Sequence, residues 1–191
     1  MTETTREGKP LASGQWRAWA FAWGLAESTF FFIVPDVFIT RLALQDFRRS
    51  LVACVWAVGG ALLGGAILWW VSDVEMGSRL LRAFTHIPGI NRDLIASAGQ
   101  AMHEQGSTSL FSGMLRGQPY KIFAVHAGVQ EVPLAAFLAF SALARMSRFV
   151  LTAALASLCA RALRGHSPRV LSHLHALVWL AFYLIYFLAM R

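Results

Sequence analysis

A stretch of 21 residues from Leu51 to Val71 carries no charge at all. A helix needs about 20 apolar residues to cross the hydrocarbon core of a bilayer. The rest of the chain has the same character, since 57% of its 191 residues are hydrophobic and only 14% are charged. A soluble domain could not cover so much apolar surface with so few charges. The sequence therefore predicts an all-α polytopic membrane protein.

Two further stretches are long and apolar enough to be helices across a bilayer, at residues 133–163 and 170–190. The region 72–109 is more polar, and its apolar residues recur at helical spacing, which predicts an amphipathic surface region. After a polar tail at residues 1–15, no linker and no change of composition divides the chain. We expect a single membrane domain over residues 16–191, with about three full transmembrane helices.

Two other apolar segments are interrupted by helix breakers. The segment 16–47 contains Pro35, and the segment 110–131 contains Gly117 and Pro119. Proline inside a helix removes a backbone hydrogen bond, and irregular backbone at membrane depth must be shielded by protein or by a water-filled cavity. Broken segments in corresponding positions of two halves are typical of paired re-entrant elements with a substrate site between them. We therefore expect two re-entrant helical hairpins.

The basic residues predict an orientation in the membrane. If each hairpin enters and leaves by one face, nine basic residues share one side: Arg6, Lys9, Arg17, Arg41, Arg48, Arg49, Arg161, Arg164 and Arg169. Four lie on the other: Arg79, Arg82, Arg92 and Arg191. The positive-inside rule then puts the N-terminus in the cytoplasm and the C-terminus outside.

Two carboxylates, Glu27 and Asp36, lie among apolar residues of the first broken segment. An ionised carboxylate at membrane depth costs about 2.5–3.5 kcal/mol even on the lenient insertion scale, and such residues usually face a bundle interior and serve function. The alternative is structural, with Glu27 capping one hairpin arm and Asp36 capping the helix after Pro35. The two roles are compatible in Asp36.

The segment after Pro133 carries a narrow polar stripe. Ser141, Arg145, Arg148 and Thr152 fall on one face of a helix, and the other positions are almost all apolar. Such a stripe should face protein or water, so we expect an internal basic surface whose partners are the two carboxylates or an anionic headgroup. The alternative is that the arginines extend to one membrane interface.

Arg116 and Lys121 flank the break of the second segment. Basic residues beside the N-terminus of a half-helix are well placed to hold a phosphate. Interfacial anchoring is the alternative role for both.

Small residues predict close helix packing. Gly60 and Gly64 form a small-xxx-small pair, which suits packing within the chain or between copies in a homo-oligomer equally well. Cys54 and Cys159 both lie in apolar stretches, so we read them as buried small residues and not as a disulfide or a metal site.

Several classes of function are disfavoured. The basic residues are dispersed and flank apolar runs, so we expect no nucleic-acid partner. The sequence contains no convincing metal-ligand spacing, no phosphate-binding loop, no dinucleotide fingerprint and no Ser/His/Asp set. We predict neither a metal nor a cofactor, and no enzymatic reaction.

Three ordered motifs resemble a known family. AESTFFFIVPDVFITRLAL is similar to the "E-S-x-F-F-x-x-x-P-D" opening of the YqaA-like branch of the DedA (VTT-domain, SNARE-associated) superfamily. FSGMLRGQPYKIFAVHAG resembles its second signature, "F-x-G…P-Y-K-x-F…A-G". The third motif, "F-x-x-x-S-x-x-x-R-x-x-R-F", is matched by Phe137, Ser141, Arg145, Arg148 and Phe149. The resemblance covers roughly residues 18–190.

This resemblance implies two re-entrant hairpins facing each other in a small bundle, and it implies lipid translocation. Bacterial relatives resemble transporters of undecaprenyl phosphate or phospholipid with proton or sodium coupling, and eukaryotic relatives are scramblases. The family's acidic pair corresponds to Glu27 and Asp36, and its basic hairpin residue to Lys121, with Arg116 matched more loosely.

We therefore expect a flippase-like or scramblase-like transporter of an anionic lipid in the inner membrane of a bacterium. Its expected substrate and coupling residues are Glu27, Asp36, Arg116, Lys121, Arg145 and Arg148. Two alternatives are a membrane enzyme that modifies lipid phosphates and a structural membrane-assembly factor.

Overall fold

The structure is a computed structural model that describes residues 14–163, 165 and 167–189. Residues 1–13 of the expected tail lie outside the described residues, as do four basic residues used to predict topology: Arg6, Lys9, Arg164 and Arg191. Every regular element among the described residues is helical, which confirms the predicted fold class at that level.

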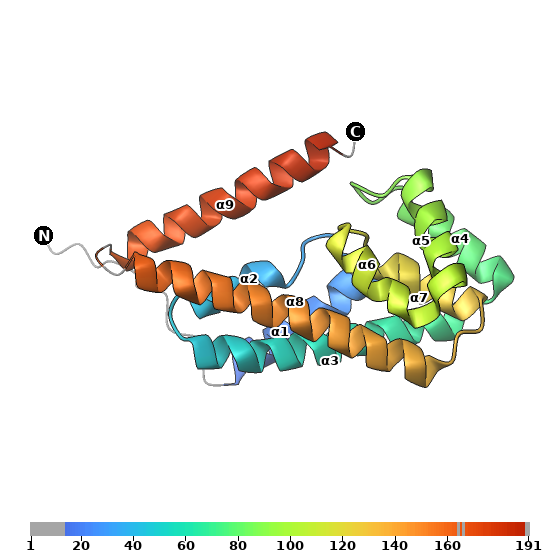
Figure 1. Ribbon diagram of the computed structural model, residues 1–191, viewed down its shortest axis with the longest axis horizontal. Helices are drawn as coiled ribbons and strands as arrows, with labels where there is room; N and C mark the ends of the chain where they lie inside the picture. The colour runs from blue at the N-terminus through green and yellow to red at the C-terminus, as the bar shows by residue number, and fades with distance from the viewer. Residues whose placement is uncertain (1–13, 164, 166, 190–191) are drawn as a thin grey trace, which may run out of the picture.

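The helices form an elongated bundle (Figure 1). In chain order they are α1 (Gln15–Thr29), α2 (Asp36–Ala43), α3 (Phe47–Val71), α4 (Val74–Phe84), α5 (Arg92–Gln105), the 3₁₀ turn η1 (Gly106–Thr108), α6 (Ser109–Leu115), α7 (Tyr120–Val129), α8 (Leu134–Ala162) and α9 (Pro168–Ala189).

Three of these helices, α3, α8 and α9, are long and apolar enough to cross a membrane. They correspond to the three stretches for which the sequence predicts transmembrane helices. The polar region contains α4 and α5, whose starts are fixed by side-chain caps: Asp73 accepts from the backbone N–H of Met76 at 2.7 Å, and Asn91 from that of Leu94 at 2.8 Å.

Each broken apolar segment is a pair of short helices. α1 and α2 are joined by residues 30–35, and α6 and α7 by residues 116–119. Pro35 and Pro119 are the N-cap residues of α2 and α7, and Gly117 adopts the left-handed backbone with φ of +71°. In each pair the second helix therefore begins directly after a proline, and in the second pair the break also contains a left-handed glycine.

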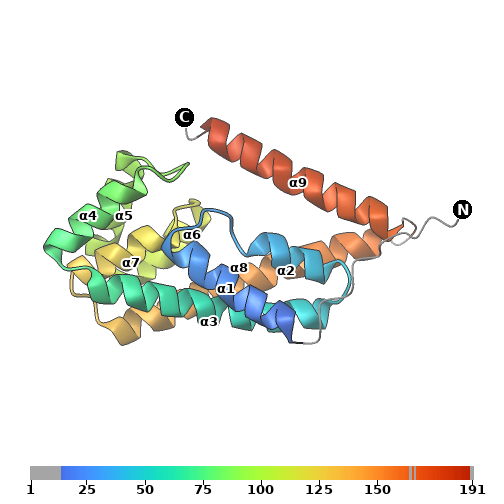
Figure 2. The same ribbon diagram turned by 180° about the vertical axis from the view of Figure 1, so that it is seen from behind.

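The two helix pairs approach the middle of the bundle from opposite ends. α1 lies along α3, and α7 contacts the far part of α3, where Tyr120 adjoins Gly65. Figures 1 and 2 show the start of α3 and the end of α8 at one end of the bundle, and α4 and α5 at the other.

Glycines allow α1 and α3 to touch backbone to backbone. A Cβ on Gly60 would collide with the carbonyl oxygen of Phe21, and one on Gly64 with the hydroxyl of Ser28. Gly24 of α1 meets the backbone of Ala57 in the same way. Gly60 and Gly64 thus serve packing inside the chain.

The last helix, α9, stands apart from the rest of the bundle over much of its length (Figure 2). None of the residues in its apolar window is buried. Elsewhere Cys54 is buried in α3 as expected, but the expectation of burial is wrong for Cys159, which is exposed near the end of α8. The helical face that carries Cys159 points away from the bundle, a direction that apolar composition alone does not reveal.

Candidate functional site

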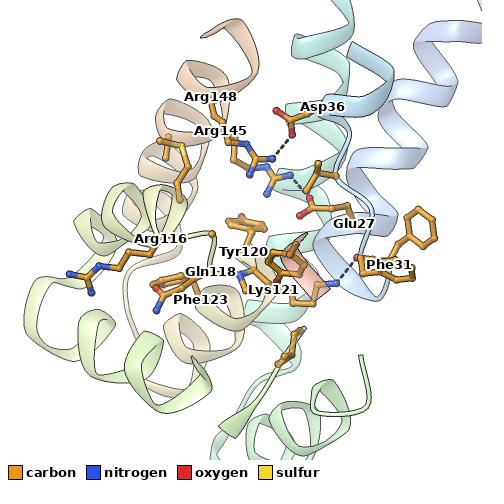
Figure 3. A pocket seen from close by; sticks show the side chains of 18 of the residues that line it. Glu27, Phe31, Asp36, Arg116, Gln118, Tyr120, Lys121, Phe123, Arg145 and Arg148 are labelled. Atoms are coloured by element: carbon orange, nitrogen blue, oxygen red, sulfur yellow. Dashed lines mark hydrogen bonds and ion pairs between the residues drawn. The ribbon is translucent and has the colours of Figure 1, made fainter. Parts of the chain in front are cut away.

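Two ion pairs join the first helix pair to α8 (Figure 3). Glu27, near the end of α1, binds the guanidinium of Arg145. Asp36, the first residue of α2, binds Arg148 with 2.7 Å between Oδ2 and the guanidinium nitrogen. The hydroxyl of Thr152 donates to the other oxygen of Asp36 at 3.0 Å. Both carboxylates therefore bind side chains of α8.

The break at residues 30–35 makes this convergence possible. Glu27 and Asp36 are nine positions apart. In a continuous helix they would lie about 13.5 Å apart along the axis and about half a turn out of phase, so they would point to opposite sides. On α8, by contrast, Arg145, Arg148 and Thr152 follow at i, i+3 and i+7 and share one face. The turn brings both carboxylates to that face.

These contacts bear on two structural alternatives, the capping of α2 by Asp36 and the direction of the arginine stripe. Asp36 begins α2, but no side chain caps that helix, because its carboxylate is bonded to Arg148 and Thr152. Glu27 and Arg145 are each only 6% exposed. Arg145 therefore faces the protein interior, and Arg148 lines the cavity beside it.

Aromatic rings complete the surroundings of the arginines. The Arg145 guanidinium lies 4.7 Å from the ring centroid of Tyr120 and 5.3 Å from that of Phe149, and Arg148 lies 5.1 Å from Phe149. Ring faces attract such cations, most strongly where water is excluded. The Nε atoms of both arginines are buried and have no hydrogen-bond partner among the described residues. Each arginine thus retains an unused donor.

Lys121 is the third buried cation of the site. It is 2% exposed, and its ammonium donates a hydrogen bond to the backbone carbonyl of Phe31 at 2.6 Å. Phe31 lies in the break of the first helix pair, and Lys121 follows the break of the second, so this bond connects the two breaks. No carboxylate of the described residues forms a salt bridge with Lys121.

A cavity of about 530 Å³ opens beside these groups. This volume is in the range of small-molecule sites, about 300–1,000 Å³. Its inner lining includes three cations, Lys121, Arg145 and Arg148, and two carboxylates, Glu27 and Asp36, and a fourth cation, Arg116, borders it. The inner part of the cavity therefore carries one positive charge in excess, and the remaining walls are mainly apolar and aromatic.

Arg116 is not brought into this cluster. It lies in the loop between α6 and α7, is exposed, and borders the cavity. Figure 3 shows its side chain directed away from both ion pairs. Gly117 and Pro119 shape this loop, and Pro35 is buried beside Asp36. Of the six predicted substrate and coupling residues, five converge and Arg116 stays at the rim.

The structure adds one wall that sequence reasoning missed, the aromatic face of α9. Trp179 donates to the Thr40 hydroxyl at 3.1 Å, and the Tyr183 hydroxyl accepts from the backbone N–H of Val34 at 2.9 Å. Trp179, Phe182, Tyr183 and Tyr186 all line the cavity. Their spacing of three and four residues is the signal that could have identified this face.

The described residues contain no group of three or more His, Cys, Asp or Glu side chains arranged to hold a metal ion. Comparisons with known protein families, with curated proteins and with solved structures find no match to this chain.

Proposed function

We propose that this protein is an integral membrane transporter that moves an anionic lipid between leaflets. The observation that carries the proposal is Lys121, a buried ammonium that contacts a backbone carbonyl and no carboxylate of the described residues, in the wall of a cavity. A buried charge without a counter-ion is costly, and a lipid phosphate would supply the missing negative charge.

Two other features support a lipid as the anion. The cavity walls beyond the charged cluster are largely apolar, and three helices of the chain are long and apolar enough to cross a membrane. A small soluble anion would use the cations but not the aromatic walls. The motif resemblance to the DedA superfamily agrees with the same proposal.

In the proposed mechanism the carboxylates hold the arginines while the site has no lipid. An arriving headgroup competes for Lys121 and for the free Nε donors of Arg145 and Arg148. Protonation of Glu27 or Asp36 would release the paired arginine to the headgroup, which offers a route to proton coupling. Sodium is the other coupling ion that we propose.

We further propose a bacterial inner-membrane location with the N-terminus in the cytoplasm, on the basis of the charge count and the motif resemblance. We favour transport over modification of the lipid because, among the described lining residues, the hydroxyl that donates to a carboxylate is that of Thr152, and its partner Asp36 is already paired with Arg148.

The test is transport of a fluorescent anionic phospholipid in proteoliposomes, with a zwitterionic lipid as the parallel substrate. Lys121→Met keeps the length of the side chain and removes the charge; we expect it to slow anionic transport by about tenfold or more, as the loss of a charge-assisted contact implies. Arg79→Gln, on the exposed surface of α4, is the matched control and should not change the rate.

Glu27→Gln and Arg148→Gln should also abolish transport while the protein stays folded and inserted, as judged by size-exclusion chromatography. Full transport by these variants and by Lys121→Met would refute the proposal. Mass analysis of the recovered lipid separates transport from chemistry, because a transporter returns its substrate unchanged.

A further inference from the structure

The inward face of α9 is built of aromatic rings. Trp179, Phe182 and Tyr186 recur at helical spacing and all line the cavity. They also contact one another, with ring centroids 5.4 Å apart for Trp179 and Phe182 and 6.3 Å apart for Phe182 and Tyr186. From Trp179 to Tyr186 this face extends about 10 Å along the helix axis.

This face is not a packed helix–helix interface. Phe182 is 50% exposed although it lines the cavity, and no residue in the apolar window of α9 is buried. The opposite face of α9 is aliphatic, with exposed residues such as Leu177, Leu180 and Leu184. The helix thus presents two different apolar faces, one of rings toward the cavity and one of branched aliphatic chains away from it.

The aromatic wall continues into the charged part of the cavity. Phe31 and Phe32 form the facing side, and the ring of Phe32 lies 5.9 Å from that of Phe187 on α9. Phe31 connects the two parts, since it lines the cavity and its backbone carbonyl accepts a hydrogen bond from the Lys121 ammonium. A molecule with one anionic end and one apolar end could therefore contact Lys121 and the α9 rings at once.

We propose that the aromatic face of α9, together with Phe31 and Phe32, is a binding subsite for one hydrocarbon chain of the lipid whose headgroup binds at Lys121. This inference rests on the proposed function and deepens it. One leaflet of the hydrocarbon core is about 15 Å thick, so a wall of about 10 Å covers most of the length of a chain within one leaflet. Flat rings give a large contact area and lose little side-chain entropy.

The experiment tests whether a lipid that contacts the α9 rings is the same lipid whose headgroup binds at Lys121. A photoreactive benzophenone amino acid is introduced at position 182, or at position 180 as the matched control on the outward face of α9. The protein is reconstituted in vesicles with equal parts of phosphatidylcholine and phosphatidylglycerol. After illumination, the ratio of anionic to zwitterionic adducts is measured by mass spectrometry.

At position 182 we expect anionic adducts to be enriched about tenfold over the bulk ratio, the size of effect that one charge-assisted contact to the headgroup implies. Adding Lys121→Met should return the ratio to that of the bulk. At position 180 the ratio should equal the bulk value with and without that substitution. A small fraction of polyprenyl phosphate in the vesicles tells whether the preferred chain is acyl or isoprenoid.

A bulk ratio at position 182 in the protein with intact Lys121 overturns the subsite, whichever lipid is used. If anionic transport still depends on Lys121 in that case, the proposed function is retained and only the α9 subsite is rejected. If the adducts are enriched but no lipid moves in proteoliposomes, the subsite stands and the transport function fails.

Discussion

The ion pair between Glu27 and Arg145 gives the sharpest test of how the site is held together. Both residues are 6% exposed, and they connect helices separated by more than a hundred residues of sequence. Removing one partner of such a pair leaves a buried charge uncompensated, which destabilises a protein by about 3–5 kcal/mol. We expect that loss in the free energy of unfolding for Arg145→Gln.

A double-mutant cycle with Glu27→Gln and the double variant measures how strongly the two residues are coupled. Glu27→Gln should cost somewhat less, because Arg145 keeps its contacts with the rings of Tyr120 and Phe149, worth about 0.5–2 kcal/mol. The double variant carries no buried charge at this position, so its loss should be smaller than the sum of the single losses by about 2 kcal/mol or more.

The assay is reversible unfolding of the purified protein in mixed micelles, followed by tryptophan fluorescence. Glu75→Gln is the control, because Glu75 pairs with Arg79 on the exposed surface of α4 and should change stability by no more than about 0.5 kcal/mol. The loss of stability for Asp36→Asn should be smaller than that for Arg145→Gln and larger than that for Glu75→Gln, because the Arg148 side chain is 28% exposed. If the loss of stability in the double variant equals the sum of the losses for Glu27→Gln and Arg145→Gln, the two residues are not coupled and the reasoning is wrong.

Three further predictions concern packing, backbone and topology. Gly60→Ala should destabilise the protein by about 1–3 kcal/mol in the same unfolding assay, because its Cβ would meet the backbone of α1, whereas Gly59→Ala, 3.8 Å from the nearest ring atoms, should be tolerated. Gly117→Ala should cost about 1–2 kcal/mol through its positive φ, while Gly117→Asn retains most of the stability; equal losses would contradict the backbone explanation. In a variant without native cysteines, thiols introduced at Ser78 and Ser167 should react with an impermeant maleimide from opposite sides of the membrane; labelling of both from one side would overturn the arrangement of the helix pairs.

The sequence was sufficient for the long helices and for the positions of the breaks. Uncharged runs of more than 20 residues leave few alternatives to a helix, and Pro35 and Pro119 cannot continue one. The spacing on α8 also placed Arg145 and Arg148 on one face of the helix, because a shared face depends only on helix periodicity.

The pairing inside the site could not be predicted in the same way. Which arginine binds Glu27 and which binds Asp36 depends on the path of residues 30–35, and this path has no periodicity to read. The place of Arg116 at the rim of the cavity was not predictable either, because it lies in the loop before α7, which has no periodic pattern. The aromatic face of α9 went unnoticed because apolar composition explained that helix without reference to which side each ring occupied.

The shortness of the paired helices has a consequence for the membrane around the site. α6 and α7 have 7 and 10 residues, so they extend about 10 Å and 15 Å, against about 30 Å for the hydrocarbon core. In the membrane arrangement that we propose, the peptide groups of the two breaks would stand at a depth that elsewhere holds only methylene groups. The low-dielectric layer would then be interrupted at the breaks, and a charge bound at Lys121 would already have crossed part of the barrier.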